Sequence, residues 1–195
     1  MGRTRSYDED TVLSGAMHAF RRKGYQAVSI RDLEEATGLK AGSLYNSFGD
    51  KAGLFDAAFA HYNRAVLRGR IDRYATAEAG LGGLRDLFLS LLHEPNGETF
   101  GCLITNTAVE LGGEAHPHRC VEEGLRTLTR TFAERLNEAR RDATLRSGVE
   151  PAHAAMKLLA LYQGILVLVR ADHDEAVLER LIINQFKDLE TRDDA

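Results

Sequence analysis

Apolar residues recur along this chain at spacings of three and four, the period of an amphipathic helix. The first such segment spans about residues 8–23, and its apolar stripe consists of Val12, Leu13, Ala16, Met17 and Phe20. Acidic residues 8–10 stand at its start and basic residues 21–23 at its end, where the helix dipole favours each charge. No segment alternates like a strand bounded by hairpin turns. The pattern therefore predicts an all-α fold.

Three more helical segments follow within the first 74 residues. Ser29, with Asp32 three positions later, predicts a short helix that caps its own N-terminus. Residues 37–39, Thr-Gly-Leu, break this helix, and a third helix is expected over about residues 40–48. A fourth, from about residue 50 into the stretch 70–73, carries apolar residues on one side. Two short helices around a glycine-containing break are typical of a helix-turn-helix.

The remainder of the chain forms a second predicted domain. Residues 75–83 are rich in Ala and Gly and mark the expected boundary. We assign residues 1–52 to a helix-turn-helix DNA-binding domain, residues 50–74 to a connecting helix, and residues 75–195 to a ligand-binding and dimerisation domain. Five helical segments are expected in the second domain, over about residues 84–93, 100–111, 117–142, 151–170 and 174–190.

Charge is unevenly distributed over the 195 residues, whose formal net charge is −4. Residues 1–73 hold twelve Lys and Arg against nine Asp and Glu, whereas the remainder holds thirteen against twenty. A mildly basic head on an acidic body fits a DNA-binding domain joined to a regulatory one.

The longest apolar stretch covers residues 158–169, too short for a bilayer, which needs about 20 apolar residues. The N-terminus lacks the apolar core of a signal peptide, and two cysteines are too few for a disulfide framework. We therefore expect a cytoplasmic protein without a membrane partner.

The expected third helix has the properties of a DNA reader. Leu44 and Phe48, four apart, would hold it to the scaffold. Gly42 costs about 1 kcal/mol inside a helix, which a close approach to DNA would explain. Asn can pair with adenine, and Lys reads guanine or phosphate. The remaining face is small or hydrogen-bonding and consists of Lys40, Ala41, Gly42, Ser43, Tyr45, Asn46 and Ser47.

The motifs at Gly24-Tyr25, Val28–Leu33, Ala36–Leu39, Gly42–Lys51 and Leu54-Phe55 together resemble the DNA-binding head of the TetR family of repressors. The resemblance covers about residues 8–60, and its glycines, aromatic residues and lysine fall at matching spacings. It implies a homodimer that places each third helix in a major groove of a palindromic double-stranded operator. The two reader helices should then lie roughly 34–36 Å apart, one DNA turn.

The resemblance also implies residue roles. Ser29, Tyr45 and Lys51 would hold phosphates, and residues 40–43 and 46–47 would face bases. Arg31 and Lys51 remain open between phosphate contact and free surface charge. Tyr45 could instead pack on the core of the head, and Asn46 and Ser47 could be plain solvated surface.

Three features of the head depart from this pattern or stay open. Lys40 stands where a Ser or Thr often caps the reader helix, and Ser47 stands where a His is frequent, so the cap and the operator preference should differ from those of relatives. Arg3 and Arg5 could reach a minor groove as an arm or form a disordered tail.

The most informative part of the second domain is the segment 100–111. Its polar-tinged stripe could line a cavity, and our ligand-binding or sensing candidates are Phe100, Cys102, Asn106, Val109, Glu110 and Tyr162. The segment resembles a subset of TetR-like regulators, some of which sense electrophiles or oxidants through a cysteine at this place. The alternative is that Cys102 is a buried small hydrophobe.

The last two predicted helices carry wide apolar faces. In TetR-like proteins the corresponding helices pair across the dimer axis, so the resemblance implies a homodimer through them. The alternative is that they only close the core of the monomer.

We conclude from the sequence that the protein is a transcriptional repressor, released from its operator by a small effector or a thiol-reactive signal. We expect no enzyme activity, cofactor or metal. The alternative is a helical metal-dependent enzyme, since Glu150 and His153 have the spacing of di-iron bundles, but those need two such motifs. His116 and His118, two apart, would not share a helix face.

Overall fold

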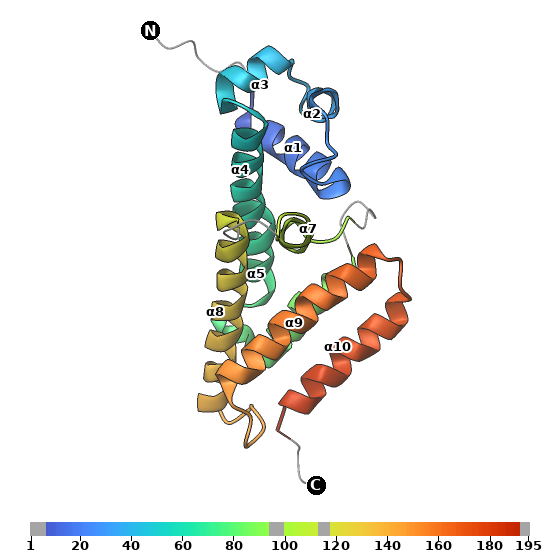
Figure 1. The fold of residues 1–195 in the computed structure, drawn as a ribbon. Coiled ribbons are helices and arrows are strands. Elements are labelled where there is room, and N and C mark those ends of the chain that lie inside the picture. Colours follow the sequence, from blue (N-terminus) through green and yellow to red (C-terminus); the bar gives the residue numbers. More distant parts are fainter. Residues whose placement is uncertain (1–6, 94–99, 113–117, 192–195) are drawn as a thin grey trace. The chain divides into compact units, whose positions relative to one another are not determined.

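The computed structural model describes residues 7–93, 100–112 and 118–191, and these form helices joined by short turns (Figure 1). The all-α expectation is confirmed, since within the described residues only an isolated bridge, between Leu145 and Glu190, has β character. The α-helices are α1 (Glu9–Lys23), α2 (Ile30–Thr37), α3 (Ala41–Phe48), α4 (Lys51–His61), α5 (Gly69–Tyr74), α6 (Gly80–Leu89), α7 (Leu103–Glu110), α8 (Arg119–Arg141), α9 (Pro151–Arg170) and α10 (Glu175–Leu189).

Helix ends follow the capping chemistry of the sequence. Asp8 caps α1 by accepting the N–H of Asp10, and Gly24 ends it with a positive φ of 83°. The predicted fourth helix is continuous in the chain, because the π-helical segment Tyr62–Arg68 joins α4 to α5. Such π segments are uncommon and concentrate at functional sites.

The glycine-rich stretch predicted as a break is partly helical. A short 3₁₀ turn (Ala77–Ala79) precedes α6, which begins at Gly80 and contains Gly83. A Cβ at Gly83 would lie 2.3 Å from the Tyr74 carbonyl oxygen and 2.4 Å from the Ala79 Cβ. Glycine at position 83 therefore lets the backbone of α6 approach the end of α5 closely. In the sequence alone, a glycine kept for such packing looks the same as a glycine in a linker.

The chain folds into two compact units whose boundaries differ from the predicted domains. The head unit comprises residues Met1–Leu67 and Leu103–Glu122, and the body unit comprises Arg68–Cys102 and Glu123–Ala195. Helix α7 and the start of α8, which the sequence assigned to the second domain, thus belong to the same unit as α1 to α4. The functional assignment of residues 1–52 and 75–195 remains a prediction.

The core of the head unit lies where α1 meets α2 and α4. Phe20, Leu33 and Phe59 are each at most 1% exposed. Phe20 and Phe55 meet edge to face, with ring centroids 4.8 Å apart. This core holds two eight-residue helices in place.

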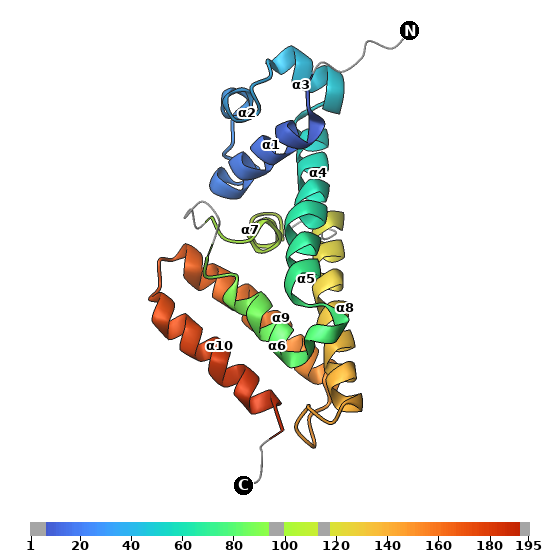
Figure 2. The ribbon, with the colours of Figure 1, turned by 180° about the vertical axis from the view of Figure 1, so that it is seen from behind.

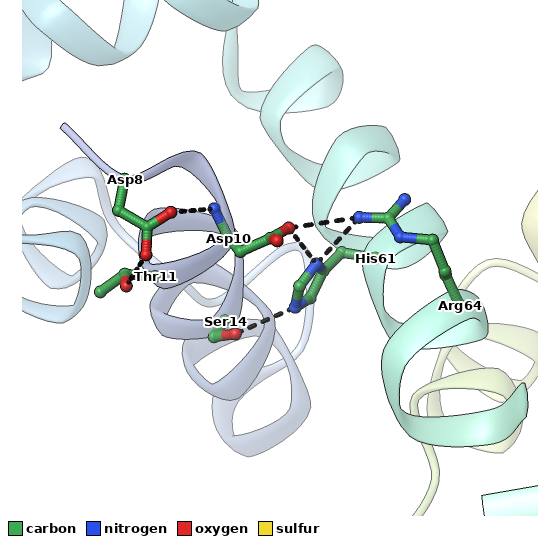
Figure 3. Close-up of polar contacts among 6 residues, drawn as sticks. All are labelled: Asp8, Asp10, Thr11, Ser14, His61 and Arg64. Atoms are coloured by element: carbon green, nitrogen blue, oxygen red, sulfur yellow. Dashed lines mark hydrogen bonds and ion pairs between the residues drawn. The ribbon is translucent and has the colours of Figure 1, made fainter. Parts of the chain in front are cut away.

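A polar network joins α1 to α4 beside this core (Figure 3). Ser14 Oγ lies 2.9 Å from Nε2 of the buried His61. Arg64, which can only donate, lies 3.2 Å from His61 Nδ1 and 3.4 Å from Asp10 Oδ1. The network ties α1 to the end of α4 and to the π-helical segment that follows it.

The start of α8 is held to α4 and the π-helical segment by polar and aromatic contacts. His118 Nε2 lies 2.9 Å from Asp56 Oδ1, and the His118 ring stacks on Phe59 with centroids 5.4 Å apart. Asn63 Nδ2 donates to the Cys120 carbonyl oxygen at 2.9 Å. These contacts explain why the chain near residue 120 folds with the head unit.

The body unit has an aromatic core centred on Phe88 of α6. Its ring lies 5.6 Å from Phe132 of α8, 5.3 Å from Tyr162 of α9 and 5.3 Å from Phe186 of α10. The last two helices lie side by side in both views (Figures 1 and 2). Four helices therefore converge on one cluster of rings.

The apolar part of α9 extends beyond the stretch 158–169 that stood out in the sequence. Among the described residues, it is the helix that length and composition would allow to cross a membrane, with a mean hydropathy of 1.6 and 39% of that window buried. Leu158, Tyr162 and Ile165 are buried in the body unit, whereas Met156 and Val167 are 57% and 50% exposed. One face of α9 is thus a core face, and the other leaves large apolar side chains uncovered.

We predict that Gly83→Ala destabilises the fold by about 1–3 kcal/mol, because the new methyl group would overpack a close contact. Gly82→Ala is the matched control, since a Cβ there would meet only the flexible Arg85 guanidinium at 4.0 Å. That control should gain roughly 0.5–1 kcal/mol from helix propensity. Urea unfolding monitored by circular dichroism measures both, and equal effects of the two substitutions would contradict the packing argument.

Candidate nucleic-acid interface

Helix α2 begins with the reciprocal cap predicted from Ser29 and Asp32. Ser29 Oγ accepts the N–H of Asp32 at 3.2 Å, and Asp32 Oδ2 accepts the N–H of Ser29 at 2.9 Å. Lys23 Nζ lies 2.6 Å from Asp32 Oδ1. Lys23 first, and then Ser29, hold the pKa of the Asp32 carboxyl well below its usual range. Ser29 is exposed, and its hydroxyl already serves the cap of α2.

The reader helix α3 presents the predicted small and polar face to solvent. Leu44 is 3% exposed, whereas Phe48 is only half-buried. Tyr45 is 42% exposed, which favours the outward role over core packing. The other residues of this face are exposed at Lys40, Gly42, Ser43 and Asn46 and half-buried at Ala41 and Ser47.

The missing cap of α3 is supplied from the preceding helix. Lys40 occupies the N-cap position without a side-chain hydrogen bond. Glu34 Oε1 of α2 accepts the N–H of Ala41 at 2.7 Å. A carboxylate at a helix N-terminus also suits the helix dipole. Sequence spacing gave no signal for Glu34, because a cap from another helix depends on the tertiary turn at Gly38, where φ is +70°.

The described residues give no packing reason for glycine at position 42. Among them, no atom lies within 4 Å of where a Cβ would stand, and the residue is exposed. Glycine inside a helix costs about 1 kcal/mol relative to alanine. The surface at Gly42 is therefore suited to something that approaches the backbone of α3 from outside.

Lys51, the first residue of α4, rests on the turn between α1 and α2. Its Nζ lies 5.0 Å from the centroid of the Tyr25 ring and donates to the Gln26 carbonyl oxygen at 3.4 Å. Tyr25 in turn packs on Phe55, with centroids 4.8 Å apart. The turn thus holds the lysine at the N-terminal end of α4, and the sequence did not identify Tyr25 as its support.

Ser47 has a side-chain hydrogen-bond partner from the chain before α1, whereas Arg31 is a surface side chain. The Tyr7 hydroxyl donates to Ser47 Oγ at 2.6 Å, so the chain before α1 reaches the last turn of α3. Arg31 is exposed on α2. Arg3 and Arg5, the candidates for a minor-groove arm, lie outside the described residues.

The ligand candidates of residues 100–111 are divided between the two units. In the head unit, Asn106 Nδ2 donates to the Arg21 carbonyl oxygen at 3.3 Å, and the Glu110 carboxylate accepts two backbone N–H groups of the α1–α2 turn. Val109 is 82% exposed. Two of the predicted candidates, Asn106 and Glu110, therefore contact the backbone of α1 and of the turn after it.

In the body unit, Cys102 and Tyr162 are 2% and 3% exposed, and Phe100 is half-buried. Cys102 precedes α7, which begins at Leu103 and not at the expected residue 100. In the described part of the chain Cys102 and Cys120 form no disulfide, and both are buried.

The Glu150 and His153 spacing has a structural explanation. Glu150 is the N-cap of α9 and accepts the His153 N–H at 2.7 Å. This contact holds the pKa of the Glu150 carboxyl below its usual range. Within the described residues no three His, Cys, Asp or Glu side chains are grouped as a metal site would require, and His116 lies outside them.

The capped α2–α3 pair, with a solvent-facing reader helix and a lysine at the start of α4, defines a helix-turn-helix regulatory protein. Residues 12–58 match the family described as bacterial regulatory proteins, tetR family, and residues 78–184 match the tetracyclin repressor-like C-terminal domain. The second match covers more than half of the chain. The chain belongs to the TetR family.

Individual relatives are similar over different lengths. The repressor ComR of Escherichia coli is 47% identical over 74 residues, which are 38% of this chain and about a third (31%) of ComR. A regulator from Lactococcus lactis is 26% identical over 88% of this chain and 87% of its own.

Among solved structures, the fold superimposes on a cysteine mutant of the TetR family regulator CifR, complexed with 26-bp double-strand operator DNA. The TM-score is 0.79 at 25% identity, covering 96% of this chain and 100% of that one. These proteins are what the chain resembles in sequence and in fold.

We predict that Glu34→Ala destabilises the protein by about 0.5–2 kcal/mol, the usual cost of losing a helix cap. Adding Lys40→Ser should recover much of that loss, since serine can cap α3 from its own N-cap position. Glu35→Ala is the matched control on the exposed side of α2. Thermal unfolding measures all three, and an unchanged stability in the Glu34 variant would contradict a capping role.

Proposed function

We propose that this protein is a sequence-specific DNA-binding transcriptional repressor. The single observation that carries the proposal is the outer face of α3. There an exposed Gly42, which no described residue packs against, stands among exposed hydrogen-bonding side chains. A major groove admits a helix whose outer face has little bulk. The operator complex recorded for CifR supports the same mode of binding here.

The residues of the head divide into two proposed roles. Phosphates are contacted by Ser29, Tyr45 and Lys51, with Arg31 on the same surface. Base edges are read by residues 40–43, 46 and 47. Contacts to phosphate set the register on DNA, whereas contacts to bases carry its sequence specificity.

The proposed assembly is a homodimer through α9 and α10. Both helices leave large apolar side chains exposed, among them Val167 at 50% and Leu181 at 44%. A symmetric partner would cover these faces and set the two reader helices about one DNA turn apart. A dimer also accounts for the apolar composition of α9 without a membrane, and we place the protein in the cytoplasm.

The proposed signal is a small effector bound in the second domain. Phe100 and Tyr162 are its candidate contacts there. Burial of Cys102 favours a packing role for this thiol over direct reaction with a thiol-reactive signal. An effector can release DNA only if it binds the released conformation more tightly than the DNA-bound one. We propose no catalytic role and no cofactor.

The DNA-binding proposal is tested on the intergenic DNA beside the protein's own gene, over a salt series. We expect tight binding to one palindromic site, with an affinity that falls steeply as salt rises. Lys51→Met should weaken binding to all sequences and reduce the salt slope by about one per phosphate contact. Asn46→Ala should instead relax base preference by about 1–3 kcal/mol at its own position.

Scrambled DNA of the same length and composition is the control for these titrations. A wild-type protein that binds scrambled and native DNA equally, with a flat salt response, would contradict the proposal.

The dimer is tested with Leu181→Glu, which places a charge in the proposed apolar contact. We expect this variant to be a monomer at micromolar concentration by sedimentation or light scattering. Arg73→Glu, on the exposed side of α5, is the control and should remain dimeric. A Leu181 variant that dimerises like the wild type would rule out this interface.

A further inference from the structure

The turn between α1 and α2 receives a carboxylate from a helix far away in sequence. Glu110, the last residue of α7, accepts the N–H of Tyr25 at 2.9 Å through Oε2 and the N–H of Gln26 at 2.7 Å through Oε1. One carboxylate thus satisfies two consecutive backbone donors, and hydrogen bonds to a charged acceptor are among the strong ones.

The sequence around the turn is shaped to admit this carboxylate. Gly24 has a φ of +83°, and a Cβ there would lie 2.9 Å from Glu110 Oε2 and 3.0 Å from Oε1. A side chain at position 24 would therefore strain the backbone and displace the carboxylate at once. Gly24 ends α1 and also leaves the space that Glu110 fills.

The position of Glu110 on its own helix has no local advantage. A negative charge at the C-terminal end of a helix is disfavoured by the helix dipole. Asn106, one turn earlier on α7, donates to the Arg21 carbonyl oxygen at 3.3 Å, so the same face of α7 contacts both α1 and the turn that follows it. This face of α7 therefore packs against backbone groups of the head unit.

The same turn also supports Lys51. Lys51 Nζ lies over the Tyr25 ring and donates to the Gln26 carbonyl oxygen. The two residues whose N–H groups bind Glu110 are therefore the two residues on which Lys51 rests. A displacement of the turn would move the support of this lysine.

We propose that Glu110 is a positioning residue for DNA binding, which sets the place of Lys51 by holding the turn at Tyr25 and Gln26. The proposal rests on the proposed function, in which Lys51 contacts an operator phosphate. It assigns Glu110 to the head, whereas the sequence pattern placed this residue among the ligand candidates of the second domain. Simple electrostatics predicts the opposite effect, because removing a negative charge near DNA strengthens binding.

The test is a double-mutant cycle of Glu110→Gln and Lys51→Met in the full-length protein, with operator affinity measured over a salt series. The amide keeps the size of the side chain but can accept only one of the two N–H groups. We expect Glu110→Gln to weaken operator binding by about tenfold and to lower the salt slope by up to about two, one phosphate contact per protomer of the dimer. In the Lys51→Met background it should add little, because both changes remove the same contact.

The charge-matched control is Asp142→Asn. Asp142 is an exposed carboxylate directly after α8, and this variant should bind operator DNA like the wild type. Glu110→Asp keeps the charge but is one methylene shorter, so we expect a partial loss. The proposal is overturned if Glu110→Gln binds as well as or better than the wild type, or if its effect and that of Lys51→Met multiply. It is also overturned if both Glu110 variants fail to fold, since Glu110 would then be needed for the fold itself.

A second readout needs no DNA and separates this inference from the proposed function. In the free wild-type protein the Tyr25 ring should shift the ε-methylene resonances of Lys51 upfield. Glu110→Gln should move these resonances toward ordinary lysine values, whereas Asp142→Asn should leave them in place. If the wild type binds no operator but this shift changes in Glu110→Gln, the proposed function is wrong and the positioning of Lys51 by Glu110 is supported. If the shift is the same in Glu110→Gln as in the wild type, Glu110 does not position Lys51.

Discussion

The rest of the structure depends on the shortness of the two helices that form the DNA-reading surface. Helices α2 and α3 have eight residues each, and isolated helices shorter than about 12–15 residues are marginal in water. Their stability therefore comes from caps and from packing on α1 and α4. Leu33 and Leu44 bury one face of each, and Ser29 and Glu34 accept N–H groups of their first turns.

The same constraint explains why the head unit includes residues from the second half of the chain. A small three-helix head has little core of its own. Helix α7 and residues 118–122 add contacts to it, through Glu110 on the α1–α2 turn and His118 on Phe59. A segment that follows Cys102 directly in the chain thus holds backbone next to the reader surface. Glu110 of α7 and Lys51 of α4 thus contact the same two residues of that turn.

Elements built from local chemistry could be predicted from the sequence. The first helix, the Ser29 cap and the glycine break each depend on residues within a few positions of one another, and the structure has them. The stretch 75–83 was not predictable in this way, because Gly83 serves a contact with Tyr74 that no local rule reports. For the same reason Glu150 and His153 resembled a metal motif, although their spacing also suits a helix cap.

The sequence by itself determined the helical class, the helix-turn-helix and the residues that its outer face presents, because helical period and capping are short-range properties. Only the tertiary structure decided which groups support that face. Glu34 caps α3 from another helix, Tyr7 reaches Ser47 across forty residues, and Glu110 binds a turn more than eighty residues away. Such contacts depend on how helices meet in space, and spacing along the chain carries no record of that.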